Sequence, residues 1–242
     1  MSGLSDYIAV IGAGALHFAD ALARYFADVL ILPPFPLLDG RIASHPDTLL
    51  ARVGGTVIVS EAYAAHAPRE IAKIASHAPV RMGKTVLRSP YPQDVAYNVF
   101  QHGGQLYART DSLDGEVTDA AREQGVLLRP VRQGYAGCSA LSCEDVVLTA
   151  DPSIASALEA DGAAVVRLTP GGIRLPGYDY GFIGGAAGYC ARTAVFFGNI
   201  DRHPDGTLIR TALNAHGIGT LSLGPDTLAD YGGIFTISLE NT

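Results

Sequence analysis

The stretch His45-Pro-Asp-Thr-Leu-Leu-Ala-Arg-Val-Gly-Gly-Thr-Val-Ile-Val-Ser60 has a near copy at Gly224-Pro-Asp-Thr-Leu-Ala-Asp-Tyr-Gly-Gly-Ile-Phe-Thr-Ile-Ser238. Each copy contains an extended segment, a Gly-Gly pair and a run rich in β-branched and aromatic residues. A Gly-Gly pair between two such runs is typical of a β-hairpin, because primed turns need positive φ angles, which glycine adopts without a steric clash. The repeated stretch therefore predicts a fold built from copies of one hairpin unit.

Three weaker copies lie between these two, at residues 95–109, 135–150 and 180–198. Their expected turns are Gly103-Gly104, Glu144-Asp145 and a longer turn that contains Gly188. The strands after the turns begin at residues 56, 105, 146, 193 and 234, so the repeats are spaced 41 to 49 residues apart. This regularity predicts one domain over residues 1–242, with hairpins near 45–60, 91–109, 134–150, 177–198 and 224–239.

One helical pattern and one short apolar run precede each hairpin. Helices are expected over residues 17–26, 69–76, 117–124, 152–161 and 207–216, and strands over 29–32, 85–87, 126–128, 164–168 and 220–223. Three strands and one helix per unit are enough for a small sheet. We therefore predict an α/β fold, a five-bladed α/β propeller of ββαβ-type repeats around a central channel. The strand at residues 7–11 is expected to pair with the last blade and remove a free sheet edge.

Composition narrows the class of protein. Of 242 residues, 48% are hydrophobic and 17% are charged, and the formal net charge is −7. An acidic chain without a cluster of Lys and Arg argues against nucleic-acid binding. No apolar stretch reaches the roughly 18 residues that span a bilayer, and no basic region of a secretion signal precedes the first apolar run. We expect a cytoplasmic protein with no membrane partner, either a monomer or a homodimer.

Cofactor and metal motifs are incomplete in this sequence. The segment Gly12-Ala-Gly14 follows an apolar run, as in a dinucleotide fingerprint, but His17 occupies the place of the third glycine. The three cysteines form no C-x-x-C pair, so neither a disulfide framework nor a zinc site is expected. We predict no cofactor and no metal.

Three segments carry a family resemblance: His45-Pro-Asp47, Gln133-Gly-Tyr-Ala-Gly-Cys138-Ser and Leu175-Pro-Gly-Tyr-Asp-Tyr-Gly-Phe-Ile-Gly-Gly185. Together with the five repeats, they resemble a bacterial branch of the pentein superfamily over essentially the whole chain. That superfamily includes guanidine-modifying hydrolases and amidinotransferases, and also a non-catalytic ribosome anti-association factor. The resemblance implies a site at one mouth of the central channel.

Pentein enzymes use a nucleophilic cysteine near the C-terminus, a histidine from an earlier repeat and carboxylates that hold the guanidinium. A guanidinium carbon is a weak electrophile, so a thiolate attacks it while the acids orient the cation. The histidine protonates the leaving amine and then activates water. This sequence departs from the pattern, because its last repeat offers Thr236 or Ser238 in place of the cysteine.

Cys138 is the candidate replacement. Aligning the turn at 144–145 with the turn at 54–55 gives an offset of 90 residues, which sets Cys138 opposite Thr48 and next to His45 and Asp47. We predict Cys138 as nucleophile, His45 as general acid and base, and Asp47 as part of the cation clamp. The structural alternatives are a buried cysteine that packs as a small apolar side chain and a His-Pro-Asp turn.

Further residues are candidates for binding the substrate. Acids at comparable positions of several repeats would favour a cationic ligand if they converge on one channel, although each acid could also be a solvated loop residue. An arginine near Cys138 could meet a substrate carboxylate, and Tyr178 and Tyr180, beside Gly184-Gly185, could form an aromatic wall or an ordinary strand entry. These substrate-binding candidates are Asp94, Asp179, Asp230, Arg132 and Tyr180.

The sequence therefore supports two functional hypotheses. The first is a hydrolase or transferase that acts on a small guanidinium-type compound through a cysteine nucleophile in the propeller channel. The second is a non-catalytic pentein that binds a ligand or a macromolecular partner.

Overall fold

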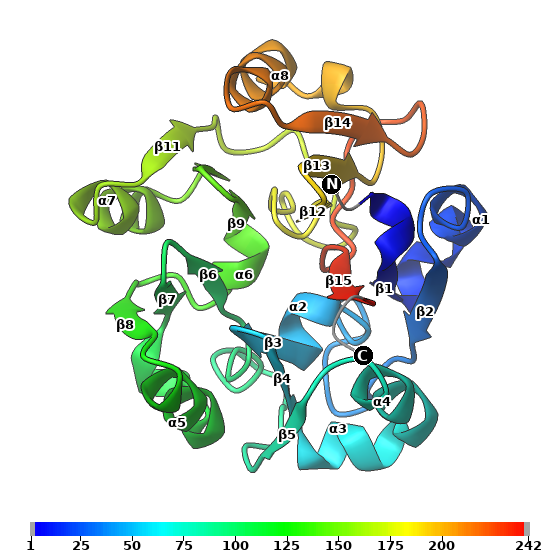
Figure 1. Ribbon diagram of the computed structural model, residues 1–242, viewed down its shortest axis with the longest axis vertical. Coiled ribbons are helices and arrows are strands. Elements are labelled where there is room, and N and C mark those ends of the chain that lie inside the picture. The colour runs from blue at the N-terminus through cyan, green and yellow to red at the C-terminus, as the bar shows by residue number, and fades with distance from the viewer. Residues whose placement is uncertain (1–2, 240–242) are drawn as a thin grey trace.

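The computed structural model describes residues 3–239, which form five three-stranded sheets around a common centre (Figure 1). The sheets are β3 (Leu50–Val53), β4 (Thr56–Ser60) and β5 (Val80–Gly83); β6 (Phe100–His102), β7 (Gln105–Ala108) and β8 (Leu127–Pro130); β9 (Ala140–Cys143), β10 (Val146–Thr149) and β11 (Ala164–Arg167); β12 (Ala187–Cys190), β13 (Thr193–Phe196) and β14 (Gly219–Ser222); and β15 (Phe235–Ser238), β1 (Tyr7–Gly12) and β2 (Asp28–Leu32). The predicted mixed α/β class with five small repeated sheets is confirmed.

In four of the sheets, an antiparallel hairpin is followed by a helical connection and a third strand parallel to the second. The helices in these connections are α3 (Glu61–His66) with α4 (Pro68–Ala75), α5 (Gly115–Glu123), α7 (Pro152–Ala160) and α8 (Gly206–Ala215). The strand after each helix therefore belongs to the sheet of the preceding hairpin. The repeat unit expected from the sequence places it with the following hairpin, and that grouping is wrong. A parallel pair needs a long crossover, and the helix supplies it.

Both ends of the chain build the fifth sheet. β1 pairs antiparallel with β15, with Ala9 opposite Thr236, and parallel with β2, with Ala9 opposite Val29. The predicted pairing of the N-terminal strand with the last blade is confirmed. The connection from β1 to β2 contains a 3-10 helix (Ala13–Phe18) and the short α1 (Ala19–Leu22), in place of the single helix expected over residues 17–26.

Two of the predicted turns are wrong. The β12–β13 turn is Ala191-Arg192, with φ angles of 47° and 54°, and Gly188 lies inside β12. A Cβ on Gly188 would come within 2.4 Å of the Ile234 carbonyl oxygen, so glycine is needed there for close packing. Gly232-Gly233 forms no hairpin, because the partner of β15 is β1.

The predicted strand at residues 85–87 is also wrong. The third strand of that sheet is β5, which pairs with β4 from Val57 opposite Val80. The Thr85 backbone instead joins a loop network, since its N–H donates to Asp114 Oδ2 at 2.7 Å and its carbonyl accepts from the Tyr97 hydroxyl.

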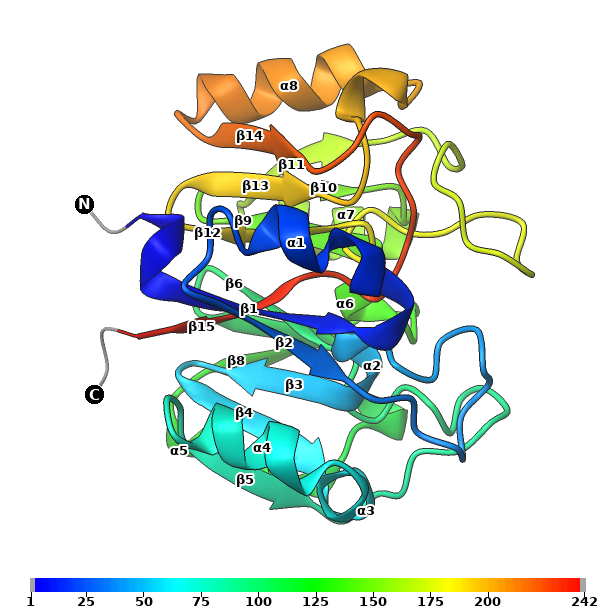
Figure 2. The same ribbon diagram turned by 90° about the vertical axis from the view of Figure 1, so that its right-hand side faces the viewer.

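One strand from each sheet, here called an inner strand, lines a central cavity of about 240 Å³. The inner strands are β3, β6, β9, β12 and β15. Helices α1, α4, α5, α7 and α8 lie at the periphery (Figure 1). The loops before the inner strands project on one side of the molecule, opposite the start of β1 and the end of β15, and the short helices α2 (Pro46–Leu49) and α6 (Ala136–Ser139) lie at their base (Figure 2). Within residues 3–239, no helix has the length and apolar content needed to cross a bilayer.

Candidate active site

Equivalent positions in three repeats converge where the inner strands begin. α2 runs directly into β3 and α6 directly into β9, so Thr48 and Cys138 each lie two residues before their strand. Asn98 has the same relation to β6. All three side chains are buried. The 90-residue offset in the sequence thus corresponds to a real structural equivalence.

Asn98 clamps the segment that carries the thiol. Its Nδ2 donates to Cys138 Sγ at 3.1 Å, and its Oδ1 accepts the N–H groups of Gly137 and Cys138 at 2.7 and 3.3 Å. Gly137 itself allows the close approach, because a Cβ there would lie 2.8 Å from the Val99 carbonyl oxygen. The Cys138 side chain is therefore held in one orientation by a neighbouring repeat.

Two carboxyl groups surround the thiol. Burial raises the pKa of Cys138 well above its usual value, and the nearby Asp47 and Asp230 raise it further. Burial also raises the pKa of Asp47 to about 7, and Asp230 adds to this shift. Asp47 Oδ2 has no hydrogen-bond partner among the described residues. The site therefore holds a protonated thiol beside two acids that repel one another.

His45 and Asp230 are in contact with each other in the site. His45 Nδ1 lies 3.7 Å from Asp230 Oδ1, and both side chains are buried. Asp230 is fixed by the N–H groups of Phe182 and Gly232, at 2.8 and 3.0 Å. Burial lowers the pKa of His45, while Asp230 opposes that shift. His45 is therefore neutral near pH 7 and can accept a proton.

A small cavity opens onto this cluster. Its volume is about 120 Å³, and its lining residues are Ile42, His45, Thr48, Tyr135, Cys138, Leu175, Tyr178, Tyr180, Phe182 and Asp230. Asp47 lies behind it and lines the central cavity. No lysine or arginine lines the smaller cavity within the described residues. Asp230, the one acid in its described wall, thus has no lysine or arginine beside it in the cavity, and the walls are largely aromatic.

The other predicted binding residues have different positions. Tyr180 lines the cavity, as does Asp230. Asp94 is buried outside the cavity wall and contacts a residue that lines it. Its Oδ2 accepts a hydrogen bond from the Tyr135 hydroxyl at 2.5 Å. Asp179 and Arg132 are exposed and line no described part of the cavity. The structure thus brings Cys138, His45, Asp47, Tyr180 and Asp230 together, and it leaves Asp179 and Arg132 outside.

Thr236 and the other cysteine and histidine side chains described next have structural positions. Thr236 lies in β15 and lines the central cavity, where its carbonyl oxygen accepts a hydrogen bond from Arg52. Cys143 and Cys190 are buried in strands, and burial raises the pKa of each to about 12. His203 Nδ1 accepts the Asp205 N–H at 3.0 Å just before α8. No group of three His, Cys, Asp or Glu side chains within residues 3–239 is arranged to hold a metal ion.

Sequence reasoning missed Asn98, Tyr135 and Phe182, whereas it had proposed Tyr178 for an aromatic wall. A signal for Asn98 existed, because a lone amide stands among apolar residues two positions before a hairpin strand, as Thr48 does. The aromatic residues carried no such signal, since they come from loops whose course is set by tertiary packing.

Solved structures with a similar fold include dimethylarginine dimethylaminohydrolases. Dimethylarginine dimethylaminohydrolase from Pseudomonas aeruginosa, a cysteine-to-serine mutant in complex with citrulline, matches at a TM-score of 0.58 and 11% identity, over 98% of this chain and 100% of that one. A dimethylarginine dimethylaminohydrolase adduct with 4-chloro-2-hydroxymethylpyridine matches at 0.54 and 12%, over 89% and 90% of the two chains. No curated protein matched the sequence.

The five sheets, their central cavity and these matches define the class by its fold: the chain has the pentein fold. Residues 13–235 match the model of a family of unknown function, DUF6873, and the chain belongs to that family.

Proposed function

We propose that this pentein is a hydrolase or amidinotransferase that acts on a small guanidinium compound, with Cys138 as nucleophile. The observation that carries the proposal is the burial of Cys138, His45 and Asp230 in the wall of one small cavity without a lysine or arginine, with the Asp47 carboxyl group buried next to them. The general kind of function agrees with the guanidine-modifying enzymes that share the fold.

The charge of the site favours a cation. Burial raises the pKa of Asp47, and the negative charge of Asp230 raises it further. A positive ligand near both carboxyl groups relieves this repulsion. A guanidinium is planar and donates several N–H groups, which suits carboxylates. Its faces also suit the rings of Tyr135, Tyr178 and Phe182, since a cation over an aromatic face gains about 0.5–2 kcal/mol.

The bound cation also prepares the nucleophile. Burial and the nearby acids raise the pKa of Cys138, and the positive charge of the bound cation lowers it again. Neutral His45 then takes the thiol proton. The sulfur then bonds to the guanidinium carbon, and the imidazolium returns the proton to the departing amine as the C–N bond breaks. A thiouronium adduct remains on Cys138.

Water completes the hydrolase reaction. His45 removes a proton from water, the hydroxide adds to the thiouronium carbon, and the C–S bond breaks. The product leaves as a urea after losing a proton, and His45 returns its own proton to the Cys138 thiolate. In a transferase, an acceptor amine replaces water at this step.

Two observations favour a second candidate, a non-catalytic protein that binds a cation. The Cys138 thiol is protonated in the empty site, and β15 carries Thr236 where a pentein enzyme would carry its cysteine. Such a protein would use the same acids and aromatic walls without a covalent step.

A turnover experiment separates the two candidates. Methylguanidine and longer alkylguanidines are incubated with the wild-type protein, Cys138→Ser and the control Cys190→Ser, and released amine is measured. Acid-quenched protein is examined by mass spectrometry for an adduct on Cys138. The enzyme is supported by amine release that only Cys138→Ser abolishes. Binding by wild type without amine release supports the second candidate, and turnover by Cys138→Ser overturns the assigned nucleophile.

A further inference from the structure

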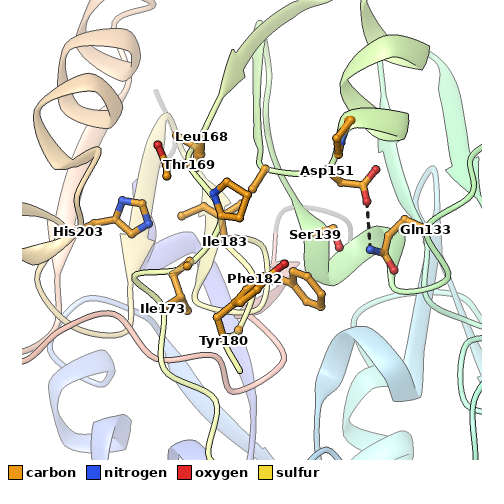
Figure 3. Close-up of a pocket in the computed structure, with 15 residues that line it drawn as sticks. Gln133, Ser139, Asp151, Leu168, Thr169, Ile173, Tyr180, Phe182, Ile183 and His203 are labelled. Atoms are coloured by element: carbon orange, nitrogen blue, oxygen red, sulfur yellow. Dashed lines mark hydrogen bonds between the residues drawn. The ribbon is translucent and has the colours of Figure 1, made fainter. Parts of the chain in front are cut away.

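A second cavity adjoins the candidate active site and has no part in the proposed chemistry. It has a volume of about 230 Å³ and lies among residues of the third and fourth sheets and the loop that joins them (Figure 3). Tyr180 and Phe182 line both cavities, and Ser139, which directly follows Cys138, lines the second one. The two rings therefore form a wall that the two cavities share, which places the cavities side by side.

An unpaired hydroxyl marks the second cavity as a binding site. Ser139 is 2% exposed, and its Oγ has no hydrogen-bond partner among the described residues. A buried hydroxyl without a partner costs about 1–3 kcal/mol. Because Ser139 lines the cavity, a polar group of a ligand would supply the missing partner.

Asp151 gives the same end of the cavity a negative charge. Its Oδ1 accepts the N–H groups of Ser153 and Ile154 at 2.8 and 3.0 Å, and its Oδ2 accepts Gln133 Nε2 at 3.2 Å (Figure 3). Although burial alone would raise the pKa of Asp151, these hydrogen bonds lower it below the usual value, so the carboxylate stays ionised.

No positive group balances this charge. No lysine or arginine lines the second cavity within the described residues. Burial lowers the pKa of His203, so its ring is neutral near pH 7. The helix α7 offers no free donor either at Ser153 or Ile154, because Asp151 already accepts both N–H groups. The cavity therefore disfavours a carboxylate or a phosphate.

Most of the remaining wall is apolar, apart from Thr169, Tyr180 and His203. Leu168, Ile173, Ile183 and Phe182 line the cavity between its polar end and Thr169 (Figure 3). Such a wall suits methylene groups, each of which gains roughly 0.8 kcal/mol when buried.

We infer that the second cavity binds the arm of the substrate, an aliphatic chain that ends in an amine or a hydroxyl group and not in a carboxylate. This inference rests on the proposed function, since the guanidinium occupies the first cavity. The terminal amine or hydroxyl donates to the Asp151 carboxylate or to Ser139 Oγ, and the chain lies along the apolar wall.

Binding is tested by calorimetry on Cys138→Ser, which prevents turnover, with methylguanidine and three compounds of equal length: 4-guanidinobutylamine, 4-guanidinobutanol and 4-guanidinobutyrate. The amine and the alcohol are each expected to bind at least about tenfold more tightly than the carboxylate, a difference of about 1.4 kcal/mol. The buried acids at the first cavity also favour positive charge, so the order of affinities in Cys138→Ser is compared with the order after a further substitution in the second cavity.

Variants assign the preference to the second cavity. Asp151→Asn keeps a residue that caps helix α7 well but removes the charge, and it should reduce the amine preference by about tenfold with methylguanidine binding unchanged. Ser139→Val fills the cavity and should weaken the amine and the alcohol alike. Asp114→Asn is the matched control, because Asp114 caps α5 and lies outside both cavity walls.

The outcomes separate this inference from the proposed function. Methylguanidine binding with equal affinity for the three arms, or an amine preference that survives Asp151→Asn and Ser139→Val, overturns the inference alone. Absence of binding by methylguanidine and by all three longer compounds overturns both.

Discussion

His45 Nδ1 lies 3.7 Å from Asp230 Oδ1, although one residue precedes the first hairpin and the other precedes the last strand. The contact depends on Gly232, since a Cβ there would come within 2.3 Å of the His45 Cβ. The Gly232 carbonyl oxygen also accepts the Asp47 N–H at 3.1 Å. The backbone of the last repeat thus positions the histidine and one acid of the first repeat.

Asp230→Asn should weaken methylguanidine binding by about 10- to 100-fold. The change removes a buried negative charge, and hydrogen bonds to charged groups contribute about 1.5–3 kcal/mol. Calorimetry on Cys138→Ser measures the effect, and Asp179→Asn is the control because Asp179 is exposed. Equal losses in both variants would contradict a specific role for Asp230.

Asp47→Asn should accelerate alkylation of Cys138 by iodoacetamide at pH 8. The Asp47 carboxylate helps to raise the pKa of the thiol, so its removal increases the thiolate fraction, and the thiolate is the reactive form. The thiol in the unmodified protein should react slowly, unlike an activated nucleophile with a depressed pKa. Peptide mass spectrometry compares Cys138 with Cys190, whose rate should not change. An unchanged rate at Cys138 would show that burial alone controls its reactivity.

The pH dependence of stability should also change in Asp47→Asn. The folded protein raises the pKa of Asp47 from 3.8 to about 7, so between these values the folded state binds more protons than the unfolded state. The contribution of Asp47 to the free energy of unfolding is fully present below pH 3.8. It is lost as pH rises toward 7, and the loss is at most about 4 kcal/mol.

Urea unfolding of both proteins between pH 4 and 8 measures this loss. The lowered pKa of His45 acts in the opposite direction, because its neutral form is favoured in the folded state. Both proteins contain His45, so the difference between their free energies of unfolding at each pH reports the contribution of Asp47. Parallel pH profiles would contradict a raised pKa for Asp47.

Asn98→Ala should destabilise the fold by about 1–3 kcal/mol and loosen the thiol segment. The change leaves the N–H groups of Gly137 and Cys138 without their acceptor, and a buried donor without a partner costs about that much. Urea unfolding gives the free energy, and the iodoacetamide rate at Cys138 reports the local opening. Ser142→Ala, a truncation at a half-buried polar residue, is the control.

The repeat predicted much of the fold because it is local. Glycine pairs at 54–55 and 103–104 mark real hairpin turns, and Gly54, Gly103 and Gly104 have positive φ angles. The same signal failed at Gly232-Gly233, where both φ angles are again positive but the strand that follows pairs with β1. A local turn signal does not identify the partner strand, since that depends on residues at the other end of the chain.

By itself, the sequence determined five similar units, their helices and the equivalence of Thr48 and Cys138, because backbone preferences and apolar spacing act within a few residues. Only the tertiary structure decided which side chains share the cavity, why Asn98 belongs with Cys138 and why Asp179 and Arg132 do not. The same holds for the protonation of the site. The pKa values of Asp47, His45 and Cys138 depend on the loss of water and on charges from distant repeats, and these arise only when the sheets assemble.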